Sequence, residues 1–172
     1  MTCINAVAYF DNTKIKGTVT FHQCNSASKV IVNIDLYDLE PNKTRAIHIH
    51  EFGDERLGCI SLGGHWNPTM ETHGTIDIQF MPRHAGDLIN NIYPDNNGVF
   101  KYVYEDDKLN LIGDVNNTII GRSVVVHDGI DDLGLGGINP YNLKKRKDSL
   151  ENGNAGSRMA CAIIGIAKSI PL

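Results

Sequence analysis

Short runs in which apolar and polar residues alternate are the feature that most restricts the fold of this 172-residue chain. In 30–37, the apolar positions 30, 32, 34 and 36 would share one face of a strand. Residues 19–22, 47–50 and 99–104 alternate similarly, and 123–127 and 162–167 are short apolar runs. No stretch repeats apolar residues at helical spacing over three turns. The pattern predicts one all-β domain over residues 1–172, a sandwich or barrel of about eight strands.

Two long segments do not fit the strand pattern. Residues 52–83 and 128–158 are rich in Gly, Asn, Asp and Pro and have no clear period. Irregular loops of this length are uncommon in compact domains and are usually either functional or disordered. Each begins directly after a strand that bears histidine, so we expect both to be functional loops.

Composition excludes several classes of protein. No run approaches the eighteen apolar residues that suggest a membrane-spanning helix. The first ten residues lack the basic and apolar regions of a secretory signal, so we expect a cytoplasmic protein. A net charge of -4 argues against nucleic acid as the main partner.

The histidines indicate where the chemistry lies. The chain has seven, and all except His22 fall between residues 48 and 127. His48 and His50 share one face of a strand, and His127 ends another strand; three imidazoles suit copper, zinc or iron. The first long segment and its end add three further histidines and a carboxylate, a set that suits zinc: His65, His73, His84 and Asp87. We expect His22 to be an ordinary solvent-exposed residue.

Seven segments carry a family pattern: 48–54 (HIHEFGD), 58–59 (GC), 64–68 (GHWNP), 84–88 (HAGDL), 120–127 (IGRSVVVH), 131–134 (DDLG) and 153–161 (GNAGSRMAC). In this order they resemble the copper/zinc superoxide dismutase family, of the eukaryotic intracellular type. The resemblance implies an eight-stranded Greek-key β-barrel with two long functional loops. It implies copper ligands His48, His50, His65 and His127, and zinc ligands His65, His73, His84 and Asp87.

The resemblance also implies the reaction, which is dismutation of superoxide anion to oxygen and hydrogen peroxide by cycling of the copper. His65 would bridge the metals and carry a proton, and Arg158 would dock the anion. Asp131 would link a copper histidine to a zinc histidine. The alternatives are a catalytically weak or inactive copper-storage module of the same fold, and a one-metal cupin that uses Glu55. The cupin alternative leaves the second histidine set unexplained.

Further implications of the resemblance concern cysteines and partners. Cys59 and Cys161 would form a disulfide, while we expect Cys3 and Cys24 to be free thiols, with Cys3 facing the core. A copper chaperone is a further implied partner. The expected homodimer interface consists of Gly53, Ile120, Gly121, Ile163, Gly165 and Ile166.

The second long loop departs from the family pattern. Leu135 stands where the family has a lysine that guides the anion, and the loop is longer than usual. One hypothesis is that Lys144 to Lys147 (KKRK) replace that charge as a positive rim; the other is that they form a solvated insertion. Gly64, Trp66 and Asn152 also differ from the usual family residues, but no expected ligand is missing.

Overall fold

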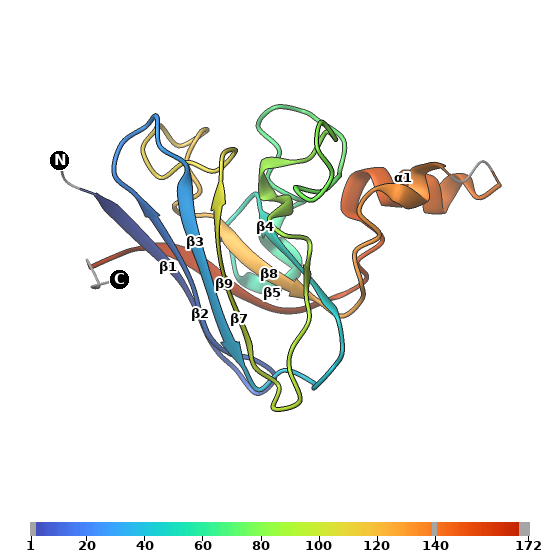
Figure 1. The fold of residues 1–172 in the computed structure, drawn as a ribbon, viewed down its shortest axis with the longest axis horizontal. Coiled ribbons are helices and arrows are strands. Elements are labelled where there is room, and N and C mark those ends of the chain that lie inside the picture. Colours follow the sequence, from blue (N-terminus) through green and yellow to red (C-terminus); the bar gives the residue numbers. More distant parts are fainter. Residues whose placement is uncertain (1–2, 139–140, 169–172) are drawn as a thin grey trace.

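A computed structural model describes residues 3–138 and 141–168. Eight antiparallel strands form a nearly closed barrel in the order β6-β4-β8-β9-β1-β2-β3-β7 (Figure 1). β3 and β4 follow each other in the chain but are not neighbours in the sheet, as a Greek-key connection requires. The strands are β1 (Ile4–Asp11), β2 (Lys16–Gln23), β3 (Val30–Tyr37), β4 (Arg45–His50), β6 (Asn91–Ile92), β7 (Phe100–Asp106), β8 (Ser123–His127) and β9 (Arg158–Ala167).

The predicted alternation is the physical basis of the barrel. Along β3, each residue from Val30 to Leu36 at an even position is completely buried, while the intervening residues are half-buried. β4 and β8 are buried along their whole length. Strands buried on both faces need a second cover besides the barrel core, and the long loops supply it. The all-β prediction is confirmed.

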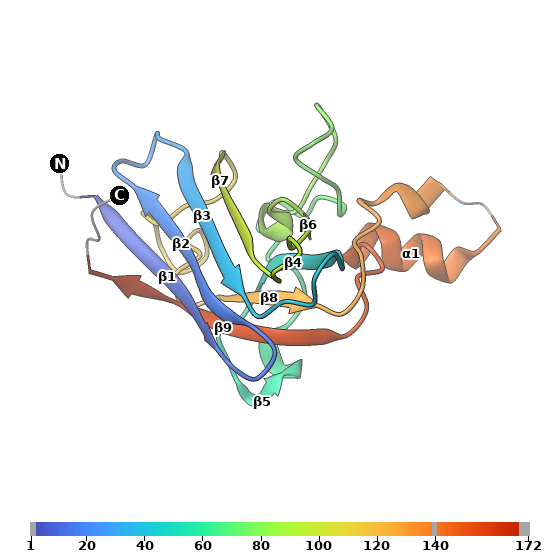
Figure 2. The same cartoon turned by 60° about the horizontal axis from the view of Figure 1, so that its bottom comes forward.

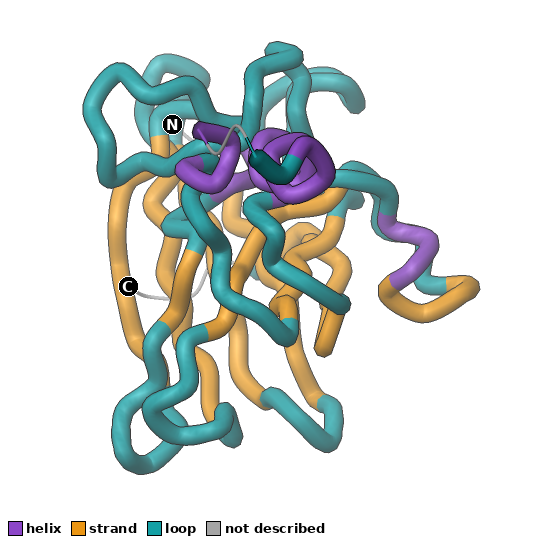
Figure 3. Tube along the Cα trace, turned by 90° about the vertical axis from the view of Figure 1, so that its right-hand side faces the viewer, coloured by secondary structure: helices purple, strands orange, loops and turns teal. Residues whose placement is uncertain are grey.

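The second long loop contains the helix α1 (Leu143–Asn152), which lies at one side of the molecule (Figure 1). From that side, loops are seen crossing in front of several strands (Figure 3). The loops also contain the short strand β5 (Arg56–Cys59) and the 3-10 turns η1 (Ile60–Leu62), η2 (Ala85–Asp87) and η3 (Leu135–Ile138). No helix within the described ranges has both the length and the apolar character needed to cross a bilayer.

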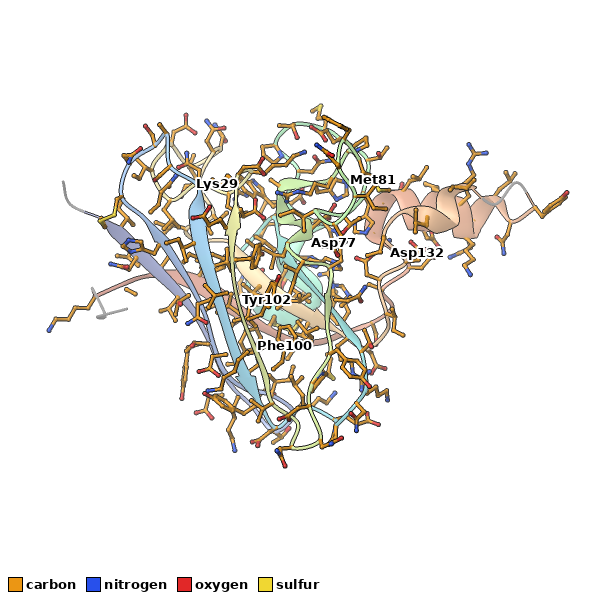
Figure 4. The ribbon with its side chains drawn as sticks, viewed as in Figure 1. Lys29, Asp77, Met81, Phe100, Tyr102 and Asp132 are labelled. Atoms are coloured by element: carbon orange, nitrogen blue, oxygen red, sulfur yellow. A yellow bond between two sulfur atoms is a disulfide. The ribbon has the colours of Figure 1, made fainter. Side chains whose placement is uncertain are left out.

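The helix α1 corrects the expectation that 128–158 is irregular. It projects from the barrel (Figures 1 and 2). A projecting helix does not require the apolar periodicity by which helices are predicted, because that periodicity serves to bury one face of a helix. Its ends are capped instead. The Asn142 side chain accepts from the Lys145 N–H at 2.9 Å, and Gly153 ends the helix with φ 64°. Asp132, labelled in Figure 4, accepts from Ser149 Oγ at 2.7 Å and anchors the helix.

Two disulfides tie the strands together. Cys59 is bonded to Cys161, as the resemblance implies, and joins the first long loop to β9. The expectation of free thiols at Cys3 and Cys24 is wrong, because these residues form the second disulfide. The pairing of Ile4 with Gln23 places the two cysteines opposite each other, one step beyond the ladder.

Removing the two disulfides should have unequal effects on stability. Cys59–Cys161 joins residues 102 apart in sequence, whereas Cys3–Cys24 joins residues 21 apart. In the chain-entropy view the longer loop contributes more, by about 1.4 kcal/mol. The Cys59→Ala/Cys161→Ala variant should therefore unfold at lower denaturant than Cys3→Ala/Cys24→Ala, both measured without metal under oxidising conditions. Equal losses would contradict this account.

Candidate metal centre

The first group of imidazoles is assembled by β4, β8 and the first long loop. In β4, His48 and His50 point away from the barrel core, into which Ile47 and Ile49 point. The ladder with β8 pairs Ile47 with Val126, so His127 follows at the end of β8. His65 reaches the group from the first long loop, where its backbone forms an isolated antiparallel β-bridge with that of His50. One nitrogen of each of the four histidines lies within 4.8 Å of the others.

Hydrogen bonds determine which nitrogen of each ring carries a lone pair toward this group. His50 Nδ1 donates to Gly63 O at 3.0 Å, and His127 Nδ1 donates to Gly156 O at 3.3 Å. Burial lowers the pKa of both rings, that of His127 to about 4, so both are neutral. Their Nε2 atoms therefore face each other, 3.2 Å apart, as lone pairs.

The other two rings add two unpaired nitrogens. His48 Nε2 donates to Asp131 Oδ2 at 2.6 Å, and its Nδ1 is buried without a partner. His65 Nε2 is likewise buried and unpartnered. Buried nitrogens without partners are costly, and four converging lone pairs repel one another unless a cation lies between them. These residues fit a metal ion.

The second group converges on one carboxylate. Asp87 Oδ1 lies 3.0 Å from His65 Nδ1, 2.9 Å from His73 Nδ1 and 3.1 Å from His84 Nδ1. The other oxygen, Oδ2, accepts from the backbone N–H groups of Gly74 and His84, which fix the carboxylate. Three nitrogens and one oxygen make a tetrahedral donor set of the kind that zinc takes. His65 is the only histidine common to both groups.

His73 lies between two carboxylates. Its Nδ1 faces Asp87, and its Nε2 is 2.8 Å from Asp131 Oδ1. Burial lowers the pKa of His73, but the hydrogen bonds to Asp131 and Asp87 outweigh burial and raise it to about 9. Without a metal ion His73 therefore keeps a proton on each nitrogen. A cation bound beside Asp87 would displace the Nδ1 proton and keep the hydrogen bond to Asp131.

Asp131 connects the two groups. One oxygen accepts from His48 and the other from His73, so one carboxylate orients a ring in each group. The sequence drew attention to Asp131 but gave no sign of its other partners. Asn90 donates to it at 3.2 Å, and Gly153 packs so closely that an added Cβ would lie 2.3 Å from Asp131 Oδ1.

Arg158 lies beside the first group. It pairs with His127 across the β8–β9 ladder and, with His50, His65 and His127, lines a pocket open to solvent. Its guanidinium donates to Cys59 O at 2.5 Å and also to Gly63 O, the carbonyl that holds His50. The side chain is therefore a fixed positive charge at the pocket.

The structure brings every predicted ligand into one of the two groups. Glu55, the residue that a cupin site would need, is exposed and belongs to no ligand group in the described part of the chain. His22 lies elsewhere, half-buried on the outer face of β2. The geometry favours two adjacent metal ions over one.

Comparison with known proteins agrees with this arrangement. Residues 15–164 match the copper/zinc superoxide dismutase (SODC) family. The chain is 45% identical over 165 residues to superoxide dismutase [Cu-Zn] of Yarrowia lipolytica, covering 95% of this chain and 98% of that one. It is 43% identical to an extracellular superoxide dismutase [Cu-Zn] of Drosophila melanogaster, covering 95% and 86%. A solved structure described as the clock protein EA4 has a TM-score of 0.81 at 35% identity, with 97% of both chains covered. The chain therefore belongs to the copper/zinc superoxide dismutase family.

Proposed function

We propose that this protein is a copper/zinc superoxide dismutase, which converts superoxide anion to oxygen and hydrogen peroxide. The observation that carries the proposal is the shared position of His65, whose two ring nitrogens face two different ligand groups. An imidazole can give up both N–H protons at neutral pH only between two cations. A storage module would need neither this ring nor a fixed Arg158 at the pocket.

We assign the residues as follows. His48, His50, His65 and His127 would hold copper, and His65, His73, His84 and Asp87 would hold zinc. Copper supplies the one-electron redox chemistry that the protein side chains lack. Asp131 keeps the rings of His48 and His73 in the tautomers that present a lone pair to each metal.

The chain's own residues would bind the anion and move protons. Arg158 attracts superoxide to the open pocket beside His50 and His127. His65 Nε2, which faces the first group, would carry one of the two protons that the reduced anion needs to become hydrogen peroxide, and water would supply the other. His65 Nδ1 lies in the second group beside Asp87, so the zinc ligand set would keep the ring in place during this transfer.

We also propose a homodimer through an apolar face of the barrel. Ile163 and Ile166 on β9 are 42% and 75% exposed, and exposed isoleucines on one strand favour self-association. An added Cβ at Gly53 would lie 2.4 Å from Gly121 O and 3.2 Å from the Ile163 side chain. Gly53 therefore lets two chain segments meet beside this face. The full proposed set is Gly53, Ile120, Gly121, Ile163, Gly165 and Ile166.

Three expectations stay proposals: a single domain over residues 1–172, a cytoplasmic location and a copper chaperone as a partner. The eight strands of the barrel share one core, which supports a single domain.

Metal removal and return tests the proposed function. The purified chain loaded with copper and zinc should remove superoxide rapidly, and the metal-free chain should not. Zinc alone should leave it inactive, and copper added to the zinc form should restore activity, because only copper changes oxidation state here. Metal analysis should find one of each ion per chain. A fully loaded protein without activity would leave the storage module as the better description.

Substitution of Arg158 separates charge from packing. Arg158→Gln should lower kcat/KM for superoxide by about 10-fold or more, because a preorganised charge at the pocket is lost. The kcat/KM of Arg158→Lys should lie between those of the wild type and Arg158→Gln. Lysine keeps the charge but loses the fixed fork of N–H groups that binds Cys59 O and Gly63 O. Metal content serves as the control and should not change. Full activity in Arg158→Gln would remove this residue from the mechanism.

The lysine-rich run can now be tested residue by residue. Of Lys144 to Lys147, Lys144 lines the pocket, where it lies 2.5 Å from Asp148. Lys144→Gln should lower the rate about 2-fold at low ionic strength and flatten its decline with salt. Asp148→Asn should act in the opposite direction. Arg146→Gln is the matched control because Arg146 does not line the pocket. Equal salt slopes in all four proteins would favour the solvated insertion.

A further inference from the structure

A second cluster of metal-binding side chains lies outside the metal centre. Cys3, His22 and Cys24 each offer a donor atom, and the three atoms lie within 4.8 Å of one another. In the β1–β2 ladder Asn5 pairs with His22, which places Cys3, Asn5, His22 and Cys24 on one face. This is the outer face, because the neighbouring Ala6 and Phe21 are buried in the core.

His22 is oriented as a metal-binding histidine is. Its Nδ1 lies 2.7 Å from Asn5 Oδ1, an atom that can only accept, so Nδ1 carries the proton. The Nε2 lone pair therefore points toward Cys24 Sγ, 3.2 Å away. Ligand histidines commonly donate their other N–H to an oxygen in this way, which fixes the tautomer and the ring. A histidine that only packed on the surface would not need this arrangement.

In the structure the two sulfurs are joined to each other. Reduction would change the chemistry of the cluster without moving the backbone far, because the strand ladder holds the two Cα atoms, which lie 3.9 Å apart. Two thiolates are soft donors that select Cu(I) over hard cations, and an imidazole also suits copper. All three residues are half-buried, so a small reductant and an ion can reach them.

We propose that reduction of Cys3–Cys24 opens a third metal site, in which both thiolates and His22 Nε2 bind Cu(I). The reductant is a low-molecular-weight thiol. Two such thiols give two electrons and two protons to the disulfide, forming two protein thiols and one small disulfide. Cu(I) then displaces both protein thiol protons and keeps its oxidation state. Oxidation of the pair closes the site.

The cluster lies beside a pocket of its own. His22 and Cys24 line this pocket with Lys29 and Glu105, a pair of opposite charges 4.0 Å apart, so the pocket adds no net charge to a complex of two thiolates and one Cu(I), which itself carries -1. Lys29 is labelled at one end of β3 in Figure 4. The beginning of β1 and the helix α1 lie at opposite sides of the molecule in Figures 1 and 2. The cluster also shares no residue with the metal centre. We therefore expect copper bound at the cluster to leave the reaction at the metal centre unchanged.

Competition for Cu(I) tests the proposal. The copper- and zinc-loaded full chain is reduced without oxygen and titrated with Cu(I) against a chromophoric Cu(I) chelator. The reduced protein should bind one more Cu(I) per chain than the equally reduced Cys3→Ser/Cys24→Ser variant, in which Cys59 and Cys161 are unchanged. The same protein with the disulfide closed should not bind the extra ion. Thiolate-to-copper absorption in the near ultraviolet should accompany binding.

Single substitutions distinguish a built site from thiols that bind copper anywhere. His22→Asn should weaken the extra site at least 10-fold, and Asn5→Ala should weaken it about 10-fold by freeing the ring. Superoxide dismutation should be unchanged in both variants, which also shows that they fold. The proposal is overturned if wild type and Cys3→Ser/Cys24→Ser bind equal copper. It also fails if thiol labelling shows that reduction never opens Cys3–Cys24.

Discussion

The structure depends on the burial of six imidazoles in two groups. In the group of His48, His50, His65 and His127, one nitrogen of each ring faces the others as a lone pair. None of the six histidines is more than 6% exposed as a whole residue. His48, His50 and His127 each donate one ring N–H to a fixed acceptor. The second nitrogen of each ring therefore faces the interior of the group as a lone pair. A buried lone pair that faces other lone pairs is unfavourable. The interior of this group is therefore complementary to a cation, which would stabilise it.

The atoms that orient the metal ligands also hold the loops. Asp87 presents one oxygen to the rings and uses the other to bind the backbone at Gly74 and His84. Asp131 accepts from the backbone N–H of Leu133 at 2.6 Å while it orients His48 and His73. Loop conformation and ligand orientation are thus set by the same carboxylates. A loop that shifts must also turn a ligand, so metal binding and loop order are coupled.

Local periodicity made much of this predictable. Alternation along residues 30–37 and 47–50 identified the buried faces, because a strand's faces follow directly from sequence. Alternation identified His48 and His50 as a pair for the same reason, whereas the two full ligand sets were implied by the family resemblance. The sequence did not reveal α1, whose order comes from its caps and from Asp132 and not from an apolar face. Nor did it reveal Cys3–Cys24, which depends on which residues β1 and β2 pair. Contacts such as that of Gly153 with Asp131 arise only when distant segments meet.

The net charge of -4 raises the question of how an anion reaches the copper site. The helix α1 supplies both signs to the pocket wall, since Lys144 is accompanied by Asp148 and Glu151. Charges so close together largely cancel at a distance. Arg158, in contrast, lines the pocket and donates to backbone carbonyls instead of a carboxylate. An entering anion therefore meets Arg158 as an uncompensated positive charge. The disulfide from Cys59 to Cys161 holds those carbonyls against β9. Attraction of the substrate therefore depends on a fixed local charge more than on the overall field of the protein.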